Sequence, residues 1–348
     1  MSVHDIEFIE LYVERGPDAV DHFVSGFGYA ETARSVDEAA GRDSVLLCQG
    51  ESQIVVTSGR IARAFLAEHG DGVVDIALAC DDLSASWERA VGNGAAALRA
   101  PAAGPGGWSA VVSGFGDVRH TLVAREPGSP AGPPADRVWR LSARPERFER
   151  RVVELDHVAV ALPGGTLRET VKYYGAAFGL DEYSTEYITV GTQAMDSIVV
   201  RSGSAKVTFT LIEPDLSHEP GQIDRFLEAN GGAGVQHLAL LTDDIVAAIT
   251  RCAGHGVDFL TTPTAYYDLL TERLPEFAAE IARFRDAGVL ADRDEFGHLL
   301  QLFTRSPYER RTVFYELIQR LGARGFGTSN IKALYEAVEH EQSGVGGA

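Results

Sequence analysis

Cysteine is scarce in this chain. Only Cys48, Cys80 and Cys252 occur among 348 residues, and no two of them form a CxxC pair. Such sparse and widely spaced thiols do not build a disulfide framework and are typical of proteins from a reducing compartment. No apolar run reaches the roughly 18 residues that span a bilayer, and the acidic start MSVHDIEFIE is unlike a signal peptide. We therefore expect a soluble, cytoplasmic protein without a membrane segment.

Positive charge is also in deficit. The chain carries 31 Lys and Arg against 50 Asp and Glu, which gives a formal net charge of −19. Such an acidic chain repels the phosphates of nucleic acids and of anionic membranes, so neither is expected as a partner. The composition is otherwise that of a globular protein, and the length accommodates two domains, each with its own core.

The chain does contain an internal repeat. Four pairs of segments match in the same order: 6–13 with 155–162, 71–83 with 233–245, 97–101 with 259–263, and 114–123 with 295–304. Each copy runs from a strand through a helix into several strands, which predicts an α+β protein built from βαβββ units. Because the spacing between matched segments grows along the chain, the insertions lie in the second copy, as in loops that acquire function.

The two copies are separated by a stretch without periodicity. Residues 126–136 read EPGSPAGPPAD, and six arginines follow, namely Arg137, Arg140, Arg144, Arg147, Arg150 and Arg151. We interpret these arginines as a solvated connector rather than an anion site. The predicted organisation is a first domain at 1–125, a linker at 126–151 and a second domain at 152–348.

Candidate metal ligands are present in the second copy alone. His157 stands where the first copy has Phe8, and His237 stands where it has Asp75. A third candidate is Glu316 in TVFYELIQR (312–320), a carboxylate in an apolar strand that needs a partner when buried. Two histidines and a carboxylate on one sheet can bind three positions of an octahedron, as in non-haem Fe(II) sites, although ligand type alone leaves Zn and Mn open.

The other polar candidates favour structural roles. His120 matches the position of Gln301 and is expected to be structural, whereas solvated side chains are expected at His69, His218, His255 and His298. The acidic pairs at 81–82 and 243–244 precede helical patterns, so we interpret them as helix N-caps and not as a catalytic dyad.

With these residues in view, the sequence resembles the vicinal-oxygen-chelate superfamily, and within it the α-keto-acid dioxygenases that act on 4-hydroxyphenylpyruvate. The resemblance covers nearly the whole chain and is carried by GQIDRFLE (221–228), GAGVQHLAL (232–240), TPTAYYDLL (262–270), LLQLFT (299–304), VFYELIQR (313–320) and GFGTSNIKALYEAVE (325–339). It implies two tandem domains, each a pair of βαβββ modules that form a curved, open, barrel-like sheet with helices outside, plus a C-terminal helix. The first domain would be degenerate.

The resemblance also implies the cofactor and the site. One Fe(II) per chain would be bound by His157, His237 and Glu316, with O2 as co-substrate and no need for 2-oxoglutarate. Substrate contacts carried over from the family are Ser197, Thr210, Ile212, Gln222, Gln236, Gln301, Phe303, Phe314, Phe326 and Ile331. Simpler roles remain open for some of them: Phe303 and Phe314 as strand core, Gln222 as a helix cap, and Gln236 as a side chain that faces away from the metal.

Two departures from the family pattern bear on the product. The family members that form homogentisate typically read P-x-N-E-P on the strand that ends in the Glu-Pro turn and G-N-F at the start of the C-terminal helix. This chain has Thr210 and Ile212 in the first motif and Ile331 in the second. Both departures resemble the branch that forms (S)-4-hydroxymandelate and CO2 by oxidative decarboxylation and benzylic hydroxylation. Homogentisate formation is the alternative. A metal-dependent isomerase or a ligand-binding protein on this scaffold is a third hypothesis.

The C-terminal segment 329–342 is predicted to form a helix. Ile331, Leu334, Tyr335 and Val338 follow helical spacing and give one apolar stripe. Ordinary packing on the core accounts for this stripe, and a lid over the metal pocket is the sharper hypothesis. The resemblance further suggests a possible homodimer and a role in supplying 4-hydroxyphenylglycine for a peptide antibiotic.

Overall fold

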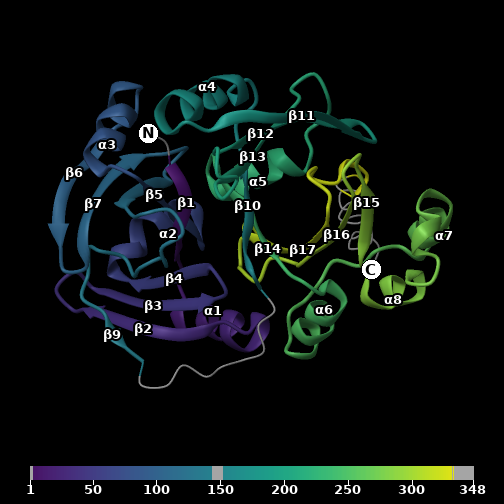
Figure 1. The fold of residues 1–348 in the computed structure, drawn as a ribbon, viewed down its shortest axis with the longest axis horizontal. Helices are drawn as coiled ribbons and strands as arrows, with labels where there is room; N and C mark the ends of the chain where they lie inside the picture. Colours follow the sequence, from purple (N-terminus) through teal and green to yellow (C-terminus); the bar gives the residue numbers. More distant parts are fainter. Residues whose placement is uncertain (1–2, 143–151, 331, 333–348) are drawn as a thin grey trace.

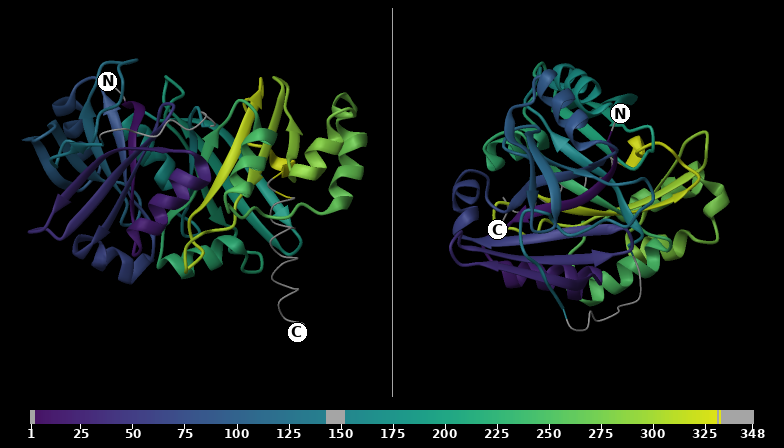
Figure 2. Two further views of the ribbon diagram at one scale, coloured as in Figure 1. Left: turned by 90° about the horizontal axis from the view of Figure 1, so that it is seen from below. Right: turned by 60° about the vertical axis from the view of Figure 1, so that its left-hand side comes forward.

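The computed structural model describes residues 3–142, 152–330 and 332. It contains two curved sheets that lie side by side, one in each half of the chain (Figure 1). The first has the strand order β6-β7-β8-β5-β1-β4-β3-β2-β9, and the second has the order β11-β12-β13-β10-β14-β17-β16-β15. The helices α6, α7 and α8 lie outside the second sheet (Figures 1 and 2). The expected α+β fold, with two tandem domains of curved sheet and helices outside, is confirmed.

The first sheet is built from two βαβββ modules and one added strand. Its first module comprises β1 (Val3–Tyr12), α1 (Gly16–Asp21), the π-helix η1 (His22–Phe27), β2 (Ala30–Asp37), β3 (Arg42–Gln49) and β4 (Ser52–Gly59). After the short helices η2 (Arg60–Ala62) and α2 (Arg63–His69), the second module comprises β5 (Gly72–Cys80), α3 (Leu83–Gly92), β6 (Ala97–Gly104), β7 (Gly107–Ser113) and β8 (Arg119–Ala124). The added strand is β9 (Arg140–Leu141), which lies within the predicted linker and pairs with β2.

The second sheet repeats this plan with an insertion. Its first module comprises β10 (Glu154–Ala161), α4 (Leu167–Phe178), β11 (Asp181–Val190), β12 (Gln193–Arg201) and β13 (Thr208–Pro214). The rest comprises α5 (Gln222–Asn230), β14 (Gly234–Leu241), α6 (Ile245–Gly254), α7 (Thr264–Arg273), η3 (Pro275–Phe277), α8 (Ile281–Ala287), β15 (Leu290–Arg293), β16 (His298–Phe303) and β17 (Phe314–Leu321). The predicted strand at 259–263 makes only an isolated bridge between Phe259 and Thr304, and α7 to α8 form the insertion.

Local capping follows the sequence pattern. Asp82 precedes α3 and accepts a hydrogen bond from the backbone N–H of Ala85 at 3.0 Å. Asp244 does the same for α6 with the N–H of Ala247, also at 3.0 Å. Each carboxylate satisfies one of the unpaired N–H groups of the first helical turn. The N-cap interpretation of these acidic residues is therefore confirmed.

Strand register defines which residues of the two copies are equivalent. Phe8 pairs with Ala77 as His157 pairs with Ala239, so Phe8 and His157 occupy the same position. The third matched pair of strands corrects the sequence comparison. β8 is the parallel neighbour of β5, as β17 is of β14, so β8 corresponds to β17 and not to β16. His120 is therefore not the counterpart of Gln301. The sequence comparison matched β8 with β16, the antiparallel neighbour of β17, instead of with β17 itself.

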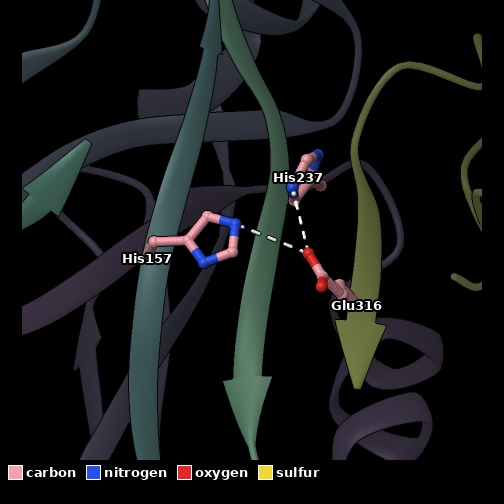
Figure 3. Close-up of side chains that lie close together, drawn as sticks. All are labelled: His157, His237 and Glu316. Atoms are coloured by element: carbon pink, nitrogen blue, oxygen red, sulfur yellow. Dashed lines mark ion pairs between the residues drawn. The ribbon is translucent and has the colours of Figure 1, made fainter. Parts of the chain in front are cut away.

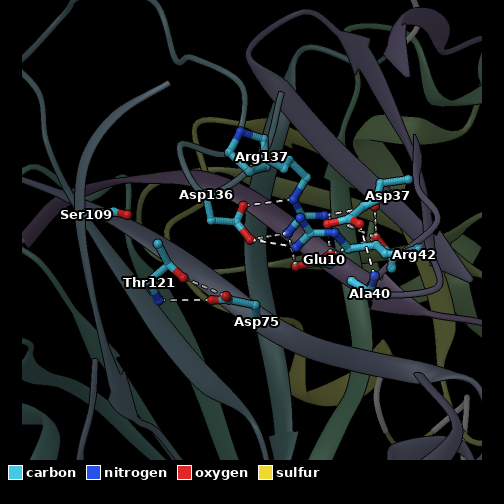
Figure 4. A network of polar contacts seen from close by, with 12 residues as sticks. Glu10, Asp37, Ala40, Arg42, Asp75, Ser109, Thr121, Asp136 and Arg137 are labelled. Carbon is cyan, nitrogen blue, oxygen red and sulfur yellow. Dashed lines mark hydrogen bonds and ion pairs between the residues drawn. The ribbon is translucent and has the colours of Figure 1, made fainter. Parts of the chain in front are cut away.

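The first domain contains a network of buried ion pairs (Figure 4), in which Asp75 holds the strand position that His237 holds in the second domain. Asp75 accepts hydrogen bonds from the Thr121 hydroxyl at 2.6 Å and from Nε of Arg119 at 2.8 Å. Glu10 accepts from Nη1 of Arg137 at 2.7 Å. Burial opposes ionisation of Glu10, but the guanidinium groups of Arg137 and Arg119 outweigh it and lower its pKa.

This network overturns part of the connector interpretation. The side chain of Arg137 is 3% exposed, because the chain after the first domain folds back and brings it to Glu10. Arg140 is exposed on β9. The other four arginines of the stretch, Arg144, Arg147, Arg150 and Arg151, lie outside the described residues.

Two histidines are buried where the domains meet. The expectation of a solvated His69 is wrong: its Nδ1 lies 2.6 Å from the carbonyl oxygen of Asn230 and its Nε2 lies 2.8 Å from Asp117. Packing of the second domain covers it, which no local pattern shows. The structural role of His120 is confirmed, since its ring contacts the carbonyl oxygen of Ile76 and the hydroxyl of Tyr174. Among the described residues, no helix has the length and apolar character needed to cross a membrane.

Arg137→Met tests the buried network. We expect the variant to lose about 3–5 kcal/mol of folding free energy, because Glu10 is left as a buried, partly uncompensated charge. The melting temperature should fall by roughly 10 °C, measured by circular dichroism. Arg140→Met, in the same stretch but exposed, is the matched control and should melt like the wild type. Equal melting of both variants contradicts a stabilising role for Arg137.

Candidate metal centre

Three neighbouring strands bring the candidate ligands together. His157 lies on β10, His237 on β14 and Glu316 on β17, and these strands are adjacent in the second sheet. Their ligand atoms all lie within 4.8 Å of one another. Oε2 of Glu316 is 3.5 Å from Nε2 of His157 and 3.3 Å from Nε2 of His237 (Figure 3). The three side chains therefore converge on a common point, with two imidazole nitrogens and one carboxylate oxygen.

Two β-bulges aim the imidazole rings. The β10–β14 register leaves one extra residue on each strand, Asp156 directly before His157 and Gln236 directly before His237. A bulge rotates the following side chain relative to the regular pleat. Oδ1 of Asp156 lies 2.8 Å from Nδ1 of His157, and Oε1 of Gln236 lies 3.2 Å from Nδ1 of His237. Both rings thus have Nδ1 occupied and Nε2 directed to the centre, the arrangement of a metal-ligating histidine.

Burial sets the charge states of the site. Burial lowers the pKa of His237, and the neighbouring Glu316 carboxylate only partly offsets this effect. The neutral imidazole, which is the form that binds metals, is therefore favoured. Burial also opposes ionisation of Asp156, yet hydrogen bonds from Arg320 and His157 outweigh it and hold the pKa of this carboxyl well below its usual range.

A chain of hydrogen bonds orients the Glu316 carboxylate, which is 1% exposed. Its Oε1 accepts from Nε2 of Gln301 at 2.7 Å, so that Oε2 remains directed at the histidines. Oε1 of Gln301 accepts from Nδ2 of Asn330 at 2.9 Å, and Oδ1 of Asn330 accepts from the Tyr266 hydroxyl at 3.1 Å. Gly327, at φ +75°, lies against Oε1 of Gln301, where a side chain would collide with it.

The predicted pocket residues on β12 and β13 share the face of the sheet that carries the ligands. Thr210 pairs with Ala159 and Ile212 pairs with Ala161, two and four residues beyond His157 on β10. Ser197 on β12 pairs in turn with Ile212. All three side chains are largely buried, and the hydroxyl of Thr210 has no hydrogen-bond partner. This face therefore offers apolar surface with one unused hydroxyl beside the centre.

Aromatic rings surround the two histidines. Phe314 stacks on His237 with centroids 5.0 Å apart, and Phe303 lies edge-on to His237 at 6.0 Å. Phe326 meets His157 edge-on at 5.1 Å. Phe303 also belongs to a buried apolar cluster with Ile212. These aromatic side chains therefore pack in the core and also lie beside the candidate metal centre.

The remaining predicted residues have different outcomes. Gln222 is the first residue of α5, whose N-cap residue is Gly221. The N–H of Gly221 donates to Oδ2 of Asp224 at 2.6 Å. The bulge brings the amide of Gln236 to Nδ1 of His237, the ring nitrogen that is not directed to the centre, so a substrate contact of Gln236 stays a prediction. Ile331 and most of the predicted helix at 329–342 lie outside the described residues.

Sequence reasoning did not identify Asp156 or Arg320 as part of the site. A signal was present, because an acidic residue precedes the matched position in both copies, Glu7 before Phe8 and Asp156 before His157. Arg320 was not recognisable, since its partner lies 164 positions away in the chain.

Glu316→Gln tests the metal centre. The substitution removes the negative charge among the three candidate ligands and retains the size of the side chain, so the affinity for Fe(II) should fall by about 100-fold or more, beyond the effect typical of an outer contact. Anaerobic titration calorimetry on metal-free protein measures the change. Glu186→Gln, at a half-buried carboxylate on β11, is the control and should bind like the wild type. Unchanged affinity in Glu316→Gln contradicts a metal site at these residues.

Two stretches of the chain match the Glyoxalase/Bleomycin resistance protein/Dioxygenase superfamily, residues 8–112 and 154–302. These matches fall on the two sheets and accord with their equivalent topology. Among solved structures, a triple-substituted 4-hydroxymandelate synthase from Streptomyces coelicolor superimposes with a TM-score of 0.90 and 51% identity, over 98% of this chain and 100% of that one.

Curated relatives agree with this assignment. The chain is 32% identical to the probable 4-hydroxyphenylpyruvate dioxygenase 2 of Aspergillus fumigatus, over 97% of this chain and 93% of that protein. It is 30% identical to the 4-hydroxyphenylpyruvate dioxygenase of Dictyostelium discoideum, over 97% of both. By these similarities along its whole length, the chain belongs to the 4-hydroxyphenylpyruvate dioxygenase family of the Glyoxalase/Bleomycin resistance protein/Dioxygenase superfamily.

Proposed function

We propose that this protein is an Fe(II)-dependent dioxygenase that converts 4-hydroxyphenylpyruvate and O2 into (S)-4-hydroxymandelate and CO2. The observation that carries the proposal is the convergence of His157, His237 and Glu316 in a chain with 51% identity to a 4-hydroxymandelate synthase over its full length. The substrate contains its own α-keto acid, so no 2-oxoglutarate is needed.

The donor set fits ferrous iron. Two imidazole nitrogens and one carboxylate oxygen on adjacent strands would hold the ion by three ligands and would leave its other positions to small molecules, as in non-haem Fe(II) sites. Bound Fe(II) would supply chelation of the keto acid and activation of O2. One group of this kind occurs among the described residues, which supports one ion per chain.

The residues of the pocket bind and orient the substrate. Phe303 and Phe314 meet at a ring-centroid distance of 6.3 Å and an interplanar angle of 77°, an arrangement that suits an aromatic guest. The hydroxyl of Thr210, buried without a partner, offers a hydrogen bond, and Ser197 contributes a second hydroxyl on the same face. Gln301 affects the substrate indirectly, because its amide donates a hydrogen bond to Glu316 and fixes the orientation of that carboxylate. We assign substrate contacts also to Gln222, Gln236 and Phe326.

The product depends on which substrate atom the pocket holds near the reacting oxygen. Orientation controls large factors in rate, so a small tilt of the ring suffices to select the benzylic carbon over the ring carbon. We assign this tilt to Ile212 and Ile331, because an apolar side chain at Ile212 gives the ring no polar partner. Attack on the ring with migration of the side chain would give homogentisate, the product expected from a polar pocket residue at that position.

The setting of the reaction follows from the same assignment. 4-Hydroxymandelate is a precursor suited to making 4-hydroxyphenylglycine, and we assign the enzyme to peptide antibiotic biosynthesis in the cytoplasm. The first domain, which lacks the candidate ligands, is free to form the interface of a homodimer.

Oxygen uptake tests the proposed reaction. Purified protein with Fe(II) and 4-hydroxyphenylpyruvate should consume O2 without added 2-oxoglutarate, and chiral chromatography should identify (S)-4-hydroxymandelate. Homogentisate as the main product contradicts the proposed branch. An absence of O2 uptake contradicts the dioxygenase altogether and favours the isomerase or ligand-binding alternative.

Ile331→Phe, alone and combined with Ile212→Asn, tests the control of the product. The larger ring and the amide should tilt the substrate, so the ratio of products should shift by about tenfold or more toward homogentisate or a ring-oxidised shunt product, which corresponds to about 1.4 kcal/mol. Chromatography of the products measures the ratio. Ile212→Val keeps an apolar side chain and should keep the wild-type product. If neither variant alters the ratio, these residues do not select the branch.

A further inference from the structure

Each domain contains a carboxylate–guanidinium pair at the same place in its sheet. Glu7 and Asp156 are the extra residues of equivalent bulges, one residue before Phe8 and His157 respectively. Their partners are Arg125, just after β8, and Arg320 on β17. Leu122 on β8 pairs with Leu78 on β5, and Leu317 on β17 pairs with Leu240 on β14, so Leu122 and Leu317 are equivalent positions. Each arginine lies three residues after its leucine and is therefore equivalent to the other.

The geometry of the two pairs is alike. Nε of Arg125 lies 2.6 Å from Glu7, and Nε of Arg320 lies 2.6 Å from Asp156. The Asp156 side chain is 8% exposed and the Glu7 side chain is 4% exposed. Arg320 in addition donates from Nη2 to Oδ1 of Asp156 at 2.7 Å, so its planar fork binds both carboxylate oxygens.

The surroundings of the two pairs differ. In the first domain Glu7 is followed by Phe8, which has no polar atom, and the pair holds the chain after the sheet: Oε1 of Glu7 accepts from the N–H of Gly132 at 2.7 Å and Arg125 donates to the carbonyl of Ser129. This pair therefore has a structural role in the first domain.

In the second domain the pair reaches the candidate metal centre. Asp156 contacts Nδ1 of His157, and Arg320 donates to the carbonyl of Gly325 at 2.7 Å. The Arg320 guanidinium also lies 5.2 Å from the centroid of the Phe326 ring, whose edge contacts His157. A carboxylate at Nδ1 keeps the proton there and leaves the Nε2 lone pair free for a metal.

We propose that Asp156 and Arg320 are positioning residues of the metal centre. Asp156 sets the tautomer and orientation of His157, and Arg320 prevents rotation of Asp156 while it holds the segment that carries Phe326. Glu7 and Arg125 are the counterpart with a structural role alone. The inference rests on the metal centre of the proposed function.

The two copies provide a matched experiment. Asp156→Asn and Glu7→Gln each replace a carboxylate by an amide of nearly equal size, and Arg320→Lys and Arg125→Lys each remove the planar fork but retain the charge. Two measurements are made on each metal-free protein: thermal unfolding, and Fe(II) affinity by anaerobic titration calorimetry. Substrate is not required.

We expect Fe(II) affinity to fall by about 10–100-fold in Asp156→Asn, and in the same direction in Arg320→Lys. Glu7→Gln and Arg125→Lys should bind Fe(II) within twofold of the wild type, although all four variants lower the melting temperature. If both pairs had only a structural role, Fe(II) affinity would not differ in this way between the variants of the two domains.

Two results overturn the inference: wild-type Fe(II) affinity in folded Asp156→Asn, or an equal loss in Glu7→Gln. If Asp156→Asn does not fold, Arg320→Lys decides by the same comparison with Arg125→Lys. A wild-type chain that binds no Fe(II) overturns the proposed function and this inference with it, and is thereby distinguished from failure of the inference alone.

Discussion

The buried carboxylate of Glu316 is the constraint on which the second domain depends. It is almost fully enclosed, and its partners among the described residues are the Gln301 amide and the imidazoles of His157 and His237. An isolated carboxylate in such a place costs several kcal/mol unless a positive charge compensates it. A divalent cation bound by the same three residues would supply that charge. The apolar surroundings of Glu316 thus create the need for a compensating positive charge, and a bound metal ion would meet that need.

The first domain meets a related requirement by different means. Its sheet encloses Glu10 and Asp75 near the equivalent position, and the guanidinium groups of Arg137 and Arg119 neutralise them. Arg137 is almost fully buried in this network, whereas Arg119 is 29% exposed. The two copies therefore share the same backbone plan, but one contains ion pairs where the other contains candidate metal ligands.

The second domain combines a rigid centre with an apolar pocket. Hydrogen bonds fix Glu316 through Gln301 and Asn330, and burial raises the pKa of Tyr266 at the end of this chain to about 12, so its hydroxyl keeps its proton. Ile212 and the rings of Phe303 and Phe314, in contrast, offer apolar surface rather than polar contacts. A fixed centre beside a pocket that acts by shape is suited to selecting between two nearby carbon atoms of one substrate.

Much of this architecture could be predicted from the sequence. The order of strand and helix patterns, the helix caps at Asp82 and Asp244, and the comparison of the two copies led to the α+β modules and to the three candidate ligands His157, His237 and Glu316. These patterns are local or repeat along the chain. The burial of Arg137 and His69 could not be predicted in this way, and neither could the equivalence of β8 and β17 in the two sheets. They arise from contacts between residues far apart in the chain.

The sequence by itself determined the repeat, the types of its elements and the identity of the residues able to bind a metal. Only the tertiary structure decided that bulges would turn two imidazoles toward one carboxylate, and that Arg320 would bind Asp156 across the sheet. The physical reason is that side-chain chemistry is encoded residue by residue, whereas the direction of a side chain depends on strand pairing, which only the folded chain establishes.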